Sequence, residues 1–124
     1  MGQNIPTLHD LFKERIQNLL VVFDDIAIPL NKIRLRPGGS DAGHNGLKSI
    51  QEVLATNEYP KLRFGIGNNF PKGMQSGFVL GKWSNEEEPI VKKKIDLCVE
   101  VIETFATAGI NTAMNNYNNV EITL

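Results

Sequence analysis

Hydrophobic and polar positions recur along the chain with two different periods, and these periods predict its helices and strands. The run "LHDLFKERIQNLL", residues 8–20, carries apolar side chains near helical spacing and predicts a short helix. The next run, "LLVVFDD", is continuously apolar from Leu19 to Phe23, which is typical of a central strand buried on both faces of a parallel sheet. It ends in two carboxylates, Asp24 and Asp25, at the end of a strand where α/β folds place their chemistry.

Two shorter segments alternate with the period of a β-strand. In "NKIRLRP", Ile33 and Leu35 face one way and the basic residues face the other way. In "KLRFGIG", the three large apolar residues share one face, and two glycines lie on the other; a glycine within a strand often marks the close approach of another backbone or a ligand. Side-by-side pairing of the two strands would bring together Arg34, Arg36 and Arg63.

Two further helices are predicted by stripes of apolar residues three and four positions apart. The stripe of the first, which follows a glycine-rich loop, consists of Leu47, Ile50, Val53 and Leu54. The second is the run "NEEEPIVKKKIDLCVEVIETFATAG", in which Ser84 caps an acidic first turn and Gly109 ends the helix. Its expected buried stripe consists of Ile95, Val99, Ile102 and either Phe105 or Ala106.

Composition narrows the class of protein. A chain of 124 residues with 41% hydrophobic and 22% charged residues is expected to form one soluble domain, spanning 1–124, around a single core. No apolar run approaches the roughly 18 residues that a membrane span needs, and the first residues do not resemble a secretory signal. The lone Cys98 cannot form an internal disulfide and falls in an apolar helical pattern, so we interpret it as a core residue of a cytoplasmic protein.

The charge of the chain is unevenly distributed. A net charge of −1 argues against a protein that coats nucleic acid. From Lys32 to Lys82, however, basic residues outnumber acidic ones, so the middle of the chain is a local basic patch.

The segment "RLRPGGSDAGHNGLKSI", residues 34–50, places four glycines between a basic strand and a helix. Two nucleotide-binding motifs do not fit, because "GIGNNF" lacks the last glycine of GxGxxG and "GLKS" breaks the GK[ST] of a Walker A loop. What remains is a helix N-terminus at His44 and Asn45, whose free backbone N–H groups suit an anion or a polarised carbonyl. Spacing alone leaves plainer roles open: a helix cap for Asn45, a structural hydrogen bond for His44, a turn cap for Asp24 and Asp25, and solvent-facing positions for the arginines.

The combination of these segments resembles the bacterial-type peptidyl-tRNA hydrolases, which cleave the ester joining a peptide to the 3′ end of a tRNA. The segments that carry the resemblance are "VVFDDIAIPLNKIRLRPGGSDAGHNGLKSI", "YPKLRFGIGNNFPKG" and "FVLGKW". The resemblance runs from about Leu19 to the C-terminus. It implies an α/β fold, a three-layer sandwich around a mixed β-sheet.

The resemblance also implies roles near the reacting ester. Asp24 matches the carboxylate that orients the family's catalytic histidine, and Asn45 matches a substrate-binding asparagine. His44 matches a loop histidine that is not the catalytic base, and Gly43 beside it is expected on the substrate side. No metal and no cofactor are expected.

A second set of residues is expected to bind RNA. Arg36 and Arg63 fall where the family clamps a tRNA phosphate, and Arg34 and Lys72 are candidates for additional RNA contacts. The loop "NNFPKG" falls beside the family's substrate cleft. The implied partner is the acceptor end of peptidyl-tRNA, with no membrane involved.

Three features of the family are not found in this sequence: an initial strand carrying an asparagine, an RHNxG segment with the catalytic histidine, and an MNxSG segment. Ala27 and Asn31 also stand where the family usually has Asp and Gly, and His9 lacks the RHN context. We therefore expect a peptidyl-tRNA hydrolase truncated at its N-terminus and lacking the general base. The alternatives are a non-catalytic module that binds the tRNA acceptor end, or a fragment that self-associates through an exposed sheet edge.

Overall fold

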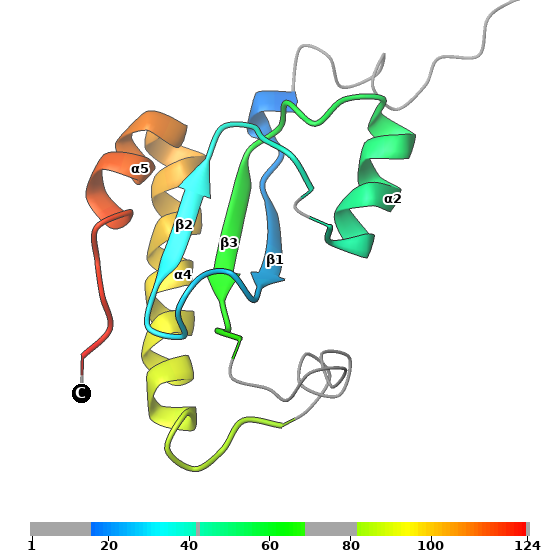
Figure 1. The fold of residues 1–124 in the computed structure, drawn as a ribbon. Helices are drawn as coiled ribbons and strands as arrows, with labels where there is room; N and C mark the ends of the chain where they lie inside the picture. Colours follow the sequence, from blue (N-terminus) through cyan, green and yellow to red (C-terminus); the bar gives the residue numbers. More distant parts are fainter. Residues whose placement is uncertain (1–15, 42, 69–81, 124) are drawn as a thin grey trace, which may run out of the picture.

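The computed structural model describes residues 16–41, 43–68 and 82–123, and its centre is a three-stranded mixed sheet (Figure 1). The strands are β1 (Val21–Asp25), β2 (Ile33–Arg36) and β3 (Lys61–Gly65), in the spatial order β1-β3-β2. β3 pairs parallel with β1 and antiparallel with β2. Both strands predicted from alternation and the apolar strand before Asp24 are therefore confirmed.

Helices cover both faces of the sheet, so the expected three-layer α/β sandwich is confirmed (Figure 1). α2 (Asn45–Leu54) packs on one face, where a buried cluster joins Phe23, Leu47, Leu54 and Tyr59. α4 (Glu88–Ala108) and α5 (Ile110–Tyr117) pack on the other face against Ile33, Leu35 and Leu62. None of the described helices is long and apolar enough to cross a membrane.

The strand β1 does not lie where the sequence pattern placed it. It is an edge strand of the described sheet, and its residue Val22 is 48% exposed. The prediction of a central strand buried on both faces is therefore wrong. β3 holds the central position instead. The helix predicted before β1 falls mainly on residues 8–15, which lie outside the described residues. Its described part is only a short 3-10 turn, η1 (Ile16–Asn18).

The helix α4 buries a different row of side chains from the one predicted. Ile95, Val99 and Ile102 are 51%, 49% and 44% exposed. The buried row consists of Val91, Lys94, Cys98 and Val101, and its last three members each precede a residue of the predicted row by one position. The apolar surface of α4 is wider than the sheet face that it covers, and a stripe on such a helix does not specify which half is buried. On α2, Val53 is likewise exposed.

The two ends of α4 differ in how they match the sequence signals. In the turn before the helix, the Ser84 backbone N–H donates to Glu87 Oε1 at 2.9 Å and the Glu87 N–H donates to Ser84 Oγ at 3.1 Å. The N-cap of α4 is Glu87, which makes no side-chain capping bond, and not the predicted Ser84. Gly109, with φ 87°, ends the helix in a conformation that favours glycine. Cys98 is a free, buried thiol within the core, as interpreted from the sequence.

Two lysines, Lys61 and Lys94, are fully buried, and no sequence pattern indicated this. The Lys94 Nζ donates to the carbonyls of Leu30, at 2.6 Å, and Gly65, and lies 3.8 Å from the centre of the Phe64 ring. Burial lowers the pKa of Lys94 to about 8, against a smaller raising effect from the nearby Cys98. This lysine therefore ties α4 to the carboxyl end of β3.

Candidate functional site

The candidate site lies where β1 ends and the glycine-rich loop enters α2. His44 Nε2 lies 3.1 Å from Asp24 Oδ1, and His44 Nδ1 accepts a 3.2 Å hydrogen bond from the Leu47 backbone N–H. Because Nδ1 is an acceptor, the neutral ring carries its proton on Nε2 and donates it to Asp24. Phe23 packs edge-on against the imidazole, with ring centres 5.1 Å apart.

This geometry decides which residue caps α2 and which residue pairs with Asp24. The N-cap of α2 is His44, through its ring, so a capping role for Asn45 is wrong. Asn45 is the first helical residue, and it is exposed at the N-terminus of α2. Asp24, expected to orient a histidine absent from the chain, is paired here with His44.

The loop before His44 is organised by Asp41, a residue that the sequence analysis did not single out. Its Oδ1 accepts from the Gly43 backbone N–H at 2.8 Å, its carbonyl accepts from the His44 N–H at 2.8 Å, and its Oδ2 accepts from Gln51 Nε2 at 3.2 Å. Gly43 has φ 82°, which favours glycine. The Asp-x-Gly pattern, typical of turns in which an aspartate binds a backbone N–H two residues later, was the available signal.

Arg63 connects β3, β1 and the loop. Its Nη1 donates to Asp25 Oδ2 at 3.1 Å, and its Nη2 donates to the Ser40 carbonyl at 3.0 Å. The arginine and aspartate side chains are only 11% and 10% exposed, and the guanidinium carbon lies 4.9 Å from the centre of the Phe23 ring. The donors of Arg63 are therefore largely engaged within the fold, while its predicted role as a phosphate clamp stays a prediction.

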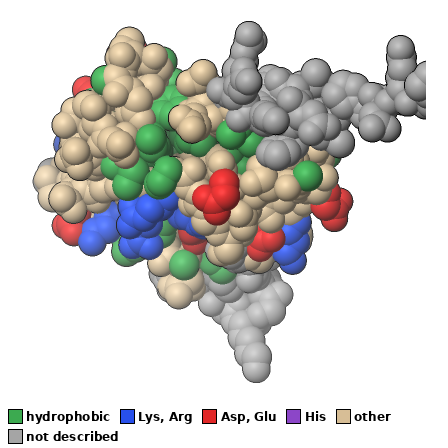
Figure 2. Space-filling model, turned by 90° about the horizontal axis from the view of Figure 1, so that it is seen from above, with side chains coloured by type: hydrophobic (Ala, Val, Ile, Leu, Met, Phe, Trp, Pro, Cys, Tyr) green, Lys and Arg blue, Asp and Glu red, His purple; other side chains and the backbone are tan. Residues whose placement is uncertain are grey.

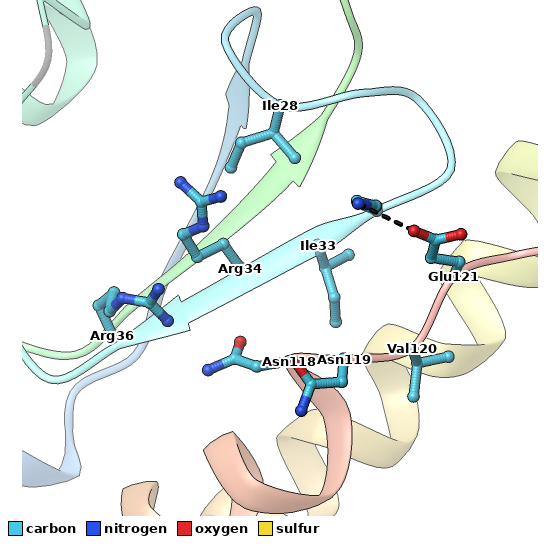
Figure 3. Close-up of a pocket in the computed structure, with 9 residues that line it drawn as sticks. Ile28, Ile33, Arg34, Arg36, Asn118, Asn119, Val120 and Glu121 are labelled. Carbon is cyan, nitrogen blue, oxygen red and sulfur yellow. Dashed lines mark ion pairs between the residues drawn. The ribbon is translucent and has the colours of Figure 1, made fainter.

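The other two arginines face solvent beside a pocket at the outer edge of β2 (Figure 3). The antiparallel register places Arg34 directly opposite Arg63, so the expected side-by-side pairing is confirmed. Arg36 Nη1 donates to the neighbouring Leu35 carbonyl at 2.8 Å. The pocket has a volume of about 320 Å³ and is bounded on the far side by residues 118–121.

The C-terminal segment forms this far wall by binding the open edge of β2. Asn118 Oδ1 accepts from the Leu35 backbone N–H at 2.7 Å, and Asn118 Nδ2 donates to the Leu35 carbonyl at 3.0 Å. An ion pair of 2.9 Å between Lys32 and Glu121 closes the other end (Figure 3). The exposed guanidinium groups of Arg34 and Arg36 thus border a hollow whose wall is held in place by hydrogen bonds.

Chemically, the described residues provide a carboxylate, a helix N-terminus and exposed guanidinium groups. No three His, Cys, Asp or Glu side chains within residues 16–41, 43–68 and 82–123 gather closely enough to hold a metal ion. Lys72 and most of the loop "NNFPKG" lie outside the described residues.

Comparison with known proteins decides the family. A family model described as "Peptidyl-tRNA hydrolase" matches residues 1–123. The chain belongs to the peptidyl-tRNA hydrolase family. The match also includes the residues before Leu19, where the sequence analysis found no resemblance.

Relatives in this family are longer than the chain. A peptidyl-tRNA hydrolase of Parabacteroides distasonis is 51% identical over 104 residues, which are 84% of this chain and 56% of that protein. One of Gloeobacter violaceus is 45% identical over 117 residues, which are 94% of this chain and 59% of that protein. The chain therefore spans little more than half the length of these peptidyl-tRNA hydrolases.

Solved structures agree with the fold. The crystal structure of peptidyl-tRNA hydrolase from Acinetobacter baumannii superposes with a TM-score of 0.79 at 28% identity and covers 92% of this chain and 58% of that one. The crystal structure of a complex of peptidyl-tRNA hydrolase with N-propanol gives a TM-score of 0.81. The peptidyl-tRNA hydrolase fold implied by the sequence is thereby confirmed.

Proposed function

We propose that the chain forms one domain of a peptidyl-tRNA hydrolase, an enzyme that cleaves the ester between a peptide and the 3′ end of tRNA. The observation that carries the proposal is the junction of Asp24, His44 and the N-terminus of α2 in a chain of this family. Asn45 and Gly43 at this junction bind the peptidyl end of the substrate. The free N–H groups of a helix N-terminus suit an ester carbonyl that gains negative charge.

The proposed RNA contacts lie on the neighbouring strands. Arg34 and Arg36 are exposed, and their guanidinium groups bind phosphate oxygens in pairs. Arg36 and Arg63 form the phosphate clamp that the family resemblance implies, and Arg34 and Lys72 provide additional RNA contacts. Because Arg63 is engaged with Asp25 and Ser40, its contact with a phosphate requires these bonds to loosen.

We further propose that the described residues alone hydrolyse the ester slowly. Ester hydrolysis needs a general base to take a proton from water, and such a base contributes about 10²- to 10⁴-fold in rate. His44 is unsuited to this role, because Nδ1 caps α2 and Nε2 binds Asp24. The second candidate function is therefore a module that binds the tRNA acceptor end without cleaving it, favoured by the exposed Arg34 and Arg36.

Two measurements test these proposals together. Single-turnover hydrolysis of peptidyl-tRNA by Met1–Leu124 is expected to be at least about 10²-fold slower than by a complete family member. A rate near that of the complete enzyme would overturn the slow-hydrolysis proposal. It would also make His44→Ala the next variant to assay.

Binding of a fluorescent tRNA acceptor stem is then followed across salt concentrations. Each phosphate contact contributes about −0.7 to the log–log slope on single-stranded RNA, so Arg36→Ala should flatten the slope by about one contact. Lys93→Ala, at an exposed position of α4, is the matched control and should change neither affinity nor slope. An equal loss of tRNA affinity in both variants would mean that binding rests on diffuse electrostatic attraction. If the wild type does not bind the acceptor stem, the binding-module function is ruled out.

The lone buried Cys98 and the substrate class support a cytoplasmic site of action for this protein. We also propose that the chain self-associates through the open edge of its sheet, because β1 has no second partner strand among the described residues.

A further inference from the structure

The segment 118–122, which follows α5, binds the outer edge of β2. The Ile122 backbone N–H donates to the Asn31 carbonyl at 2.9 Å, as in an antiparallel strand pair. Continued along β2, that register sets Asn118 opposite Leu35. Here the side chain of Asn118 completes the pair, because Oδ1 accepts from the Leu35 N–H at 2.7 Å and Nδ2 donates to the Leu35 carbonyl at 3.0 Å.

The Asn118 amide takes the place of a peptide group of a neighbouring strand. An amide side chain carries an acceptor oxygen and donor N–H groups in one plane, as a peptide does, whereas a carboxylate only accepts and an ammonium only donates. The backbone of Asn118 is helical, with φ −65° and ψ −21°, and it ends α5. One residue therefore ends a helix with its backbone and binds a strand edge with its side chain.

Leu35, the residue that Asn118 holds, lies between the two exposed arginines of β2. Its side chain is buried in the core against α4 and α5, while Arg34 and Arg36 leave the strand toward the opposite face of the sheet. Because peptide bonds join Leu35 to both arginines, hydrogen bonds that fix its backbone also limit the directions in which the two side chains extend. Seen from the end of the molecule at which β2 finishes, Lys and Arg side chains gather in a patch on the surface (Figure 2).

We propose that Asn118 is a positioning residue for RNA binding: by holding the backbone of Leu35, it keeps Arg34 and Arg36 in the arrangement that contacts phosphate groups. This role rests on the proposed binding of tRNA by these arginines. Ordering long, flexible side chains on binding costs affinity, and a strand that is already fixed in the free protein lowers that cost. β2 has only four residues and pairs with β3 along one edge, so the hold on its other edge matters.

A purely structural role for Asn118 would be to protect the edge of the sheet, and a second hydrogen bond in the same region separates the two roles. Thr104 Oγ1 and the Tyr117 hydroxyl lie 3.0 Å apart and join α4 to the end of α5. Thr104→Val removes this bond with little change in size and involves no group of β2. It is therefore the matched control for a substitution of Asn118.

Binding of the fluorescent tRNA acceptor stem by the full chain tests the proposal. Asn118→Leu, a replacement of similar size, removes both bonds to Leu35 and should raise the dissociation constant about two- to tenfold. Thr104→Val should leave the dissociation constant unchanged. Hydrogen exchange of the Leu35 amide should be faster in Asn118→Leu than in wild type, because the N–H loses its acceptor. If circular dichroism shows that Asn118→Leu does not fold, Asn118→Ala takes its place.

A double-mutant cycle then shows whether Asn118 acts through the arginines. In a protein that carries Arg34→Ala and Arg36→Ala, adding Asn118→Leu should cause no further loss of affinity at low salt, because the groups that it positions are gone. An equal loss in both backgrounds would overturn the proposal. So would wild-type affinity or unchanged Leu35 exchange in folded Asn118→Leu, or an equal loss of affinity in Thr104→Val. If wild type does not bind the acceptor stem at all, the proposed RNA binding itself fails, and the positioning role fails with it.

Discussion

Replacement of the buried Lys94 by methionine should change how the stability of the protein depends on pH. The folded pKa of this lysine is about 8, below its ordinary value of 10.5, because burial disfavours the charged ammonium. Between these two values the unfolded chain binds more protons than the folded one. The free energy of unfolding therefore rises with pH across this window, and the rise contributed by Lys94 is absent in Lys94→Met.

The magnitude follows from the two pKa values. Integrating the difference in bound protons from pH 7.5 to pH 9.5 gives a gain of about 2 kcal/mol in the free energy of unfolding for wild type relative to Lys94→Met. Cys98 opposes this trend, because burial raises the pKa of its thiol and the resulting stability is lost as the pH rises above 9.0. Both proteins are therefore compared in a Cys98→Ala background.

Urea denaturation at pH 7.5, 8.5 and 9.5 measures the effect. Lys61 is intact in both proteins, so its own lowered pKa of about 8, caused first by burial and then by Arg63 and opposed by Glu58, cancels from the difference. Lys93→Met, on the exposed side of the same helix, is the control and should keep the wild-type pH dependence. Parallel stability curves for wild type and Lys94→Met would refute the reasoning, because they would show that Lys94 titrates alike in both states.

Three further substitutions test the packing around the candidate site, each by urea denaturation. Gly65→Ala should destabilise the fold by more than about 3 kcal/mol, because the new methyl group would overlap the Pro29 carbonyl; wild-type stability would contradict this. Arg63→Lys should cost about 1.5–3 kcal/mol, since one ammonium cannot reproduce the fork that binds both Asp25 and Ser40. Asp41→Ala should cost about 1–2 kcal/mol and shift the His44 amide resonance, and an unchanged resonance would deny that Asp41 orders the loop.

Local patterns in the sequence were sufficient for the strands and for much of the site. Alternation in "KIRLR" gives the observed buried and exposed positions of β2, and the predicted pairing brings Arg34 opposite Arg63. The glycine within the second alternating strand, Gly65, does mark the close approach of another backbone, that of Pro29. These features depend on neighbours in sequence or on one strand pair, which periodicity describes well.

The features that sequence reasoning missed depend on contacts between distant segments. A lysine in a helix is expected to be exposed to solvent, and only the fold brings the carbonyls of Leu30 and Gly65 to Lys94. The burial of α4 was assigned to the wrong row, since apolar side chains occupy both the buried row and the exposed row beside it, and the rotation of the helix is set by packing on the sheet. The edge position of β1 was missed for the same reason, because an apolar run does not reveal how many strands flank it.

The geometry of Asp24 reconciles its observed partner with the role implied by the family. Its Oδ1 binds His44, and no hydrogen bond to its Oδ2 occurs among the described residues. The carboxylate is 39% exposed, and each of its oxygens can accept more than one hydrogen bond. A histidine supplied from outside the described residues can therefore bind Asp24 without displacing His44. Under the proposed function, His44 would fix the carboxylate and the loop, the added imidazole would take the proton from water, and Asn45 would lie beside the ester.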